Sequence, residues 1–192
     1  GTGRGLNLLD EKTGKFLHYR NVPGDPKSLS SNVVMAIYED RSGVLWIGTG
    51  LPFFPPDQPN DEGGLNRLNP DGTFTRYVRD PNNSNSLVNN KVRAIFEDSK
   101  GAFWVGTSGD GLHIMDREKG SFERHIYNPE KPDALSRPPL KHGGDHITFI
   151  NEDNVGAIWI GTYGAGINRF DPATKKITHY QSSNGFPDDT TW

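Results

Sequence analysis

The chain has 192 residues, a net charge of −3, no cysteine, and abundant glycine (23) and proline (14). Charges of both signs are interspersed, so no basic field favours nucleic acid or an anionic membrane surface. No apolar stretch approaches the roughly 20 residues of a membrane span, so no direct membrane insertion by this segment is expected, and the lack of cysteine excludes disulfides and thiolate metal sites.

The first predicted elements are two strands joined by a polar turn. One strand runs through Leu6-Asn7-Leu8-Leu9-Asp10, and the next carries Phe16 and Tyr19. The same pair recurs three times later in the chain, each time after two further strands. Residues 1–29 are therefore predicted to be the outer half of a repeating unit.

Each complete unit opens with an alternating strand that ends in Glu-Asp, followed by a polar turn with glycine. The dipeptides are Glu39-Asp40, Glu97-Asp98 and Glu152-Asp153. A short polar link of this kind indicates a hairpin. Because the acidic pairs recur at hairpin ends, we expect their carboxylates to form turn hydrogen bonds and not a catalytic pair.

The second strand is nearly constant and is apolar on both faces. Its copies are Leu45-Trp46-Ile47-Gly48-Thr49, Phe103-Trp104-Val105-Gly106-Thr107 and Ile158-Trp159-Ile160-Gly161-Thr162. Since side chains alternate sides along a strand, this strand must be covered twice. Four-stranded sheets stacked side by side around an axis provide that double burial, which predicts a β-propeller with the three tryptophans in its core.

The predicted fold class is all-β, a partial ring of about three and a half propeller blades, each a four-stranded antiparallel sheet. One partial propeller domain spans residues 1–192. Its predicted divisions are 1–29 (outer half of a blade), 30–87, 88–140 and 141–183 (one blade each), and 184–192 (the start of the next blade). Complete propellers contain about four to eight blades, so we expect the open blade faces to be covered by remaining blades of a longer parent chain or by a second copy.

The series Glu-Asp, x-x-Gly, x-x-Trp-Ile-Gly-Thr, Gly-Gly-Leu-Asn-Arg and Asp/Asn-Pro resembles the two-component regulator propeller repeat over essentially the whole chain. The resemblance implies the periplasmic sensor region of a membrane-anchored hybrid two-component system that signals through a histidine kinase. In many gut bacteria such proteins detect oligosaccharides released from polysaccharides. An oligosaccharide or another polar small ligand is therefore the implied partner, with no catalysis by this segment.

Two connections, 51–62 and 128–144, are longer than their counterparts in the other units. Propeller loops of this kind lie together on one face, and loops held by a rigid scaffold often carry function. The predicted ligand-binding residues combine flat apolar faces with charged hydrogen-bonding groups; they are Phe53, Phe54, Asp57, Arg137, Lys141, His142 and Tyr163. The alternatives are a self-packed loop, solvated side chains and, for Tyr163, mere cover of the blade edge.

Two other function classes stay open. A propeller glycosidase or lyase needs two carboxylates about 5 to 9.5 Å apart, and the non-repeated loop acids Asp57, Asp61 and Glu62 all come from one insertion. A protein-docking scaffold is the other alternative. No cofactor, metal ligand or catalytic residue is predicted. The glycine-rich stretch 106–111 precedes a strand, whereas a phosphate loop requires a helix start.

Overall fold

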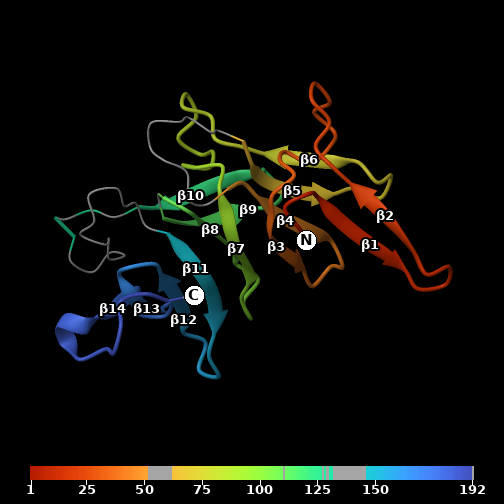
Figure 1. The fold of residues 1–192 in the computed structure, drawn as a ribbon. Helices are drawn as coiled ribbons and strands as arrows, with labels where there is room; N and C mark the ends of the chain where they lie inside the picture. Colours follow the sequence, from red (N-terminus) through yellow and green to blue (C-terminus); the bar gives the residue numbers. More distant parts are fainter. Residues whose placement is uncertain (52–61, 110, 127, 129, 132–145, 192) are drawn as a thin grey trace.

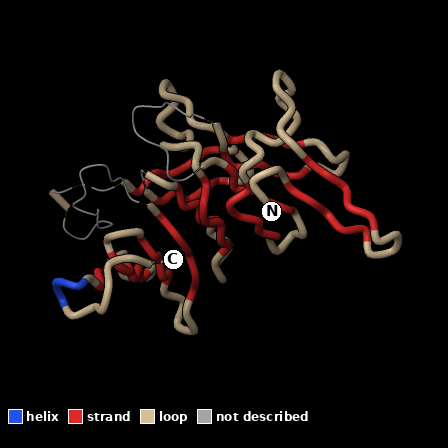
Figure 2. The backbone as a smooth tube through the Cα atoms, viewed as in Figure 1, coloured by secondary structure: helices blue, strands red, loops and turns tan. Residues whose placement is uncertain are grey.

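The computed structural model describes residues 1–51, 62–109, 111–126, 128, 130–131 and 146–191. These residues form fourteen strands and one short 3₁₀ helix, η1 (Ser182–Asn184). The strands make four antiparallel sheets that follow one another along the chain and lie side by side (Figures 1 and 2). No helix in these ranges is long and apolar enough to cross a membrane.

The first sheet has two strands, β1 (Leu6–Asp10) and β2 (Lys15–Tyr19), and each later sheet has four strands in sequential order. The second sheet contains β3 (Val34–Glu39), β4 (Leu45–Thr49), β5 (Gly64–Leu68) and β6 (Phe74–Tyr77). The third sheet contains β7 (Val92–Glu97), β8 (Phe103–Thr107), β9 (Leu112–Asp116) and β10 (Ser121–His125). The fourth sheet contains β11 (Ile147–Glu152), β12 (Ile158–Thr162), β13 (Gly166–Asp171) and β14 (Lys176–Tyr180). The predicted fold class, three full blades and a partial one, is confirmed.

The glycine in the first two Trp-x-Gly-Thr strands allows the next sheet to approach closely. A Cβ atom on Gly48 of β4 would lie 2.7 Å from the carbonyl oxygen of Val92, which begins the innermost strand of the following sheet. Gly106 of β8 meets Ile147 of the next sheet in the same way. Any side chain at these positions would push the blades apart, so the glycines are required by the spacing of the ring.

The core lies between the sheets. Trp46 and Trp104 are 2% and 3% exposed, and each belongs to an apolar cluster that joins its own sheet to the next one. Trp159 of the last sheet is only partly buried and stacks on Tyr180 at 5.7 Å. The predicted core position is therefore confirmed for Trp46 and Trp104, whereas no further sheet covers Trp159 within the described residues.

Apolar side chains remain exposed on the first sheet and on the neighbouring strand β3. The residues are Leu8, Leu9, Phe16, Leu17 and Ile37, all at least 45% exposed. Several large apolar groups exposed close together mark a surface that another body covers. The described surface is thus consistent with the expectation that further blades or a second copy complete the ring.

A buried polar residue on the third strand fixes the connection that enters each blade. Asn66 accepts a hydrogen bond from the backbone N–H of Ser30 (2.9 Å) and donates to a carbonyl oxygen of β4 (3.1 Å). His113 occupies the same position in the next blade. Its Nε2 accepts from the N–H of Val88 (3.1 Å), and its Nδ1 donates to the equivalent carbonyl of β8 (3.2 Å). Both contacts require a neutral imidazole.

His113 predicts a pH dependence of stability. Burial lowers the pKa of His113 to about 4, so between about pH 6.5 and pH 4 the unfolded chain binds a proton that the folded chain excludes. Stability should therefore fall by up to about 3 kcal/mol across this window as pH falls. Replacing His113 with Asn, the residue of the neighbouring blades, should remove this part of the dependence.

The measurement is the thermal unfolding midpoint at about pH 7 and about pH 5. His18→Asn, at an exposed histidine of β2, is the control and should behave as the unmodified chain. An equal acid-induced drop in His113→Asn and in the unmodified chain would contradict the assignment.

Candidate functional site

The repeated aspartates hold their own hairpin turns. Oδ2 of Asp40 accepts the indole N–H of Trp46 at 2.8 Å, and Oδ1 accepts the N–H of Val44 at 3.0 Å. Asp98 and Asp153 repeat this arrangement with their own tryptophans at 2.9 and 2.8 Å. Each aspartate therefore joins the turn to the core tryptophan, as the predicted role in turn hydrogen bonding requires.

The repeated glutamates act between blades. Oε2 of Glu97 accepts the N–H of Arg41, in the turn of the preceding sheet, at 2.9 Å. Glu152 likewise accepts the N–H of Ser99 at 2.7 Å and its hydroxyl at 2.6 Å. In the pairs Glu97-Asp98 and Glu152-Asp153, the aspartate thus binds its own sheet and the glutamate binds the sheet before it.

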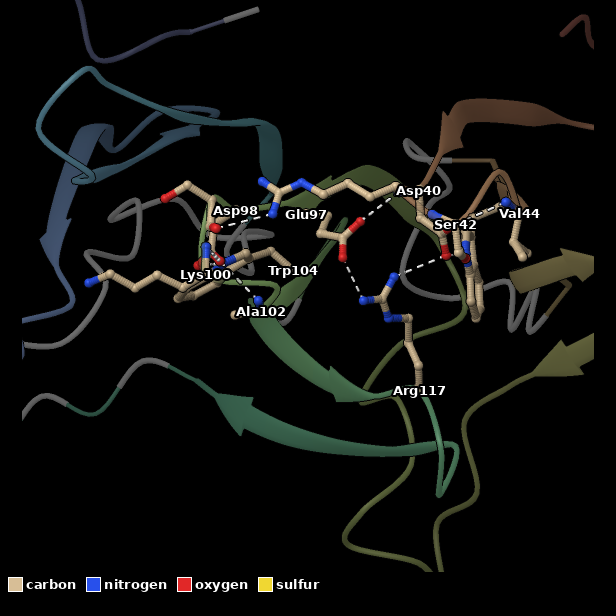
Figure 3. A network of polar contacts seen from close by, with 12 residues as sticks. Asp40, Ser42, Val44, Glu97, Asp98, Lys100, Ala102, Trp104 and Arg117 are labelled. Carbon is tan, nitrogen blue, oxygen red and sulfur yellow. Dashed lines mark hydrogen bonds and ion pairs between the residues drawn. The ribbon is translucent and has the colours of Figure 1, made fainter.

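Arg117 completes this network at the interface of the second and third sheets. Its guanidinium donates to Asp40 Oδ2 at 3.0 Å and to Glu97 Oε1 at 2.6 Å, as Figure 3 shows. Burial acts to raise the pKa of Asp40, but hydrogen bonds from Ser42, Trp46 and Val44 outweigh it and lower the pKa to about 2. The carboxylates are permanently ionised acceptors, which does not suit general acid catalysis.

The interblade contact predicts a difference between equivalent glutamates. Glu97→Ala should lower the free energy of unfolding by about 1 to 3 kcal/mol, because it leaves the Arg41 amide without its acceptor and Arg117 with Asp40 as its remaining carboxylate partner. Glu39→Ala, at the same repeat position on the exposed side of the first complete blade, should change it by less than about 0.5 kcal/mol. Chemical denaturation measures both values, and equal losses would refute the interblade role.

The opposite end of the blades carries the predicted ligand face. Six of the seven predicted ligand residues lie outside the described residues: Phe53, Phe54, Asp57, Arg137, Lys141 and His142. Tyr163, which directly follows β12, is described and half-buried. Its N–H donates to the carbonyl of His146 at 2.9 Å, and its ring meets the His146 ring edge-on at 6.3 Å.

The sequence reasoning missed a polar cluster next to Tyr163. His146 Nδ1 lies 2.6 Å from Ser108 Oγ, and the Ser108 N–H donates to the carbonyl of Lys91 at 2.8 Å. Burial lowers the pKa of His146, with smaller contributions from the charges of Arg93 and Lys91. The missed signal was the basic Lys91-Val92-Arg93 at the start of β7, where Val92 pairs with Thr107 at the end of β8.

In this cluster the hydroxyl of Ser108, which is 1% exposed, binds the imidazole of His146, and the basic side chains of Lys91 and Arg93 lie close to that imidazole. Such groups bind polar or acidic ligands. No set of three or more His, Asp or Glu side chains that could hold a metal ion exists among the described residues. The geometry of this cluster therefore suits the binding of a polar or acidic ligand.

Comparison with known proteins agrees with this architecture. Residues 28–50 and 86–109 match the two component regulator propeller family. "Histidine kinase P4" of Formosa agariphila is 34% identical over 172 residues, which make up 89% of this chain and 11% of that protein. The chain thus spans about a ninth of the length of this relative.

The chain is also similar to solved structures of propeller domains. The extracellular domain of the hybrid two component system BT3049 from B. thetaiotaomicron superposes with a TM-score of 0.70 at 29% identity, covering 91% of this chain and 22% of that one. The extracellular domain of the hybrid two component system BT4673 from the same organism also superposes with a TM-score of 0.70, at 25% identity. The match covers 98% of this chain and 24% of that one. Virginiamycin B lyase from Staphylococcus aureus, at 17% identity and a TM-score of 0.56 over 93% of this chain and 48% of the lyase, shares the fold alone.

The stacked sheets, their turn network and the polar ends of the innermost strands define the chain as a segment of a β-propeller. More specifically, the chain carries the repeat of the two component regulator propeller family at residues 28–50 and 86–109. It is homologous to extracellular domains of two-component systems.

Proposed function

We propose that this chain is part of the ligand-binding sensor of a periplasmic receptor whose parent chain is membrane-anchored and signals through a histidine kinase. The observation that carries the proposal is the likeness to the extracellular domain of a hybrid two component system over 91% of the chain. The proposed blade divisions fall after residues 29, 87, 140 and 183, and further blades of the parent chain, or a second copy, complete the ring.

The proposed ligand is an oligosaccharide or another polar small molecule that binds at the face around Tyr163. The imidazole of His146 and the basic side chain of Lys91 beside the ring of Tyr163 support this choice, because polar ligands are recognised by a few well-placed hydrogen-bonding groups beside an aromatic ring. The longer connections 51–62 and 128–144 belong to the same proposed face.

Calorimetric titration with a panel of neutral and acidic oligosaccharides tests the proposal. We expect binding without release of shorter products, and Tyr163→Ala should weaken it about tenfold through loss of ring contact. Phe16→Ala, at a 57% exposed ring on β2, is the control and should bind normally. Product release would support the propeller glycosidase or lyase instead, and no binding to any sugar would favour the docking scaffold.

A further inference from the structure

The outer strands of successive blades meet through one pair of side chains at each interface. Tyr19 packs edge-on against Phe74 at 5.4 Å between the first and second sheets, and Tyr77 packs edge-on against Phe122 at 6.2 Å between the second and third. At the third interface, the same repeat positions hold His125 and Ile177. Two smaller side chains therefore stand where the other interfaces have two aromatic rings.

A cavity of about 310 Å³ lies at this third interface, between the sheet of β7–β10 and the sheet of β11–β14. Its apolar wall includes Trp104, Leu112, Ile160, Phe170 and Ile177. At the preceding interface the equivalent tryptophan, Trp46, is covered by the ring of Tyr77 at 5.9 Å. The cavity thus occupies the region that an aromatic pair fills elsewhere.

The polar groups that line the cavity are basic or neutral. The guanidinium of Arg124 is held by the backbone carbonyls of Ser86 and Asn83, at 2.8 and 2.9 Å, in the connection that enters the third sheet. Lys131 is therefore the cation available to the cavity, and none of the lining residues is acidic. Glu123, whose carboxylate lies 3.3 Å from His125 Nε2, is 71% exposed to water, which screens its charge. The lining therefore favours an anionic group on the ligand.

The apolar wall of the cavity favours an apolar group as the uncharged part of the ligand. The indole N–H of Trp104 is already bound to Asp98 at 2.9 Å, so this ring offers the cavity only an apolar surface. A neutral sugar would leave its many hydroxyl groups without partners there, at a cost for each. A cavity of roughly 150 Å³ holds benzene in another protein, so this space is large enough for one aromatic ring with a short acidic substituent.

We propose that the space between the third and fourth sheets is a binding site for a small aromatic carboxylate. The ring lies against Trp104, Phe170 and Ile177, and the carboxylate lies near Lys131. This site is separate from the ligand face around Tyr163, so either can exist without the other.

Calorimetric titration of the full chain with phenylacetate, and with the neutral phenylacetamide as its matched probe, tests the ligand class. Phenylacetate should bind, and the amide should bind about tenfold more weakly because it lacks the charge-assisted contact. Lys131→Gln, at an exposed position, should weaken phenylacetate binding and leave amide binding unchanged. No binding of phenylacetate at millimolar concentration, or equal binding of acid and amide, would overturn the proposal.

A second variant tests the location. His125→Tyr combined with Ile177→Phe restores the aromatic pair of the other two interfaces, so it should fold, fill the cavity and abolish phenylacetate binding. Val155→Thr, at an 81% exposed residue in a hairpin turn at the other end of the blade, is the control and should bind normally. Phenylacetate binding that persists in the filled variant would show that the cavity is not the site.

Discussion

The paired carboxylates at the end of each first strand are the constraint on which the stacking of the blades depends. Asp98 binds the turn and the tryptophan of its own sheet, and Glu97 binds the turn of the sheet before it. Because the two residues are adjacent, the distance between neighbouring blades at this end is set by a single dipeptide. Glu152 and Asp153 repeat the arrangement at the next interface.

This network makes the two ends of the blades different. At the turn end, carboxylates, indoles and backbone amides bind one another, as Figure 3 shows for Asp40, Glu97 and Arg117. At the other end the hydroxyl, imidazole and basic groups of Ser108, His146 and Lys91 gather around strand starts. The hydrogen-bonded turn end can support differences in sequence and loop length at the opposite end of the blades. We therefore propose that ligand recognition takes place at that opposite end.

Much of the fold could be predicted from the sequence, because the pattern of one blade recurs several times along the chain. The recurrence of Trp46, Trp104 and Trp159 in strands that are apolar on both faces requires a stack of sheets. The same recurrence showed that the acidic pairs belong to the turns. What it could not show is the direction of each carboxylate, since Glu97 reaches a backbone amide 56 residues earlier in the chain.

The candidate site was less accessible to sequence reasoning. Loop length pointed to the end of the strands at which Tyr163 lies, but the contact between His146 and Ser108 joins residues 38 positions apart. The substitution of His113 for Asn66 is visible in an alignment of the repeats, yet its shared pattern of two hydrogen bonds appears only in three dimensions. The cavity beside His125 and Ile177 depends on how two sheets meet, which a single repeat does not reveal.

Backbone amide hydrogen exchange measured residue by residue tests most directly whether the glutamates join the blades. The amides of Arg41 and Ser99 lie in hairpin turns and should nevertheless exchange as slowly as amides of the neighbouring strands, because they donate to Glu97 and Glu152. In a Glu97→Ala variant, which removes the acceptor, protection should fall at Arg41 and stay unchanged at Ser99. Rapid exchange of both amides in the unmodified chain would contradict the account.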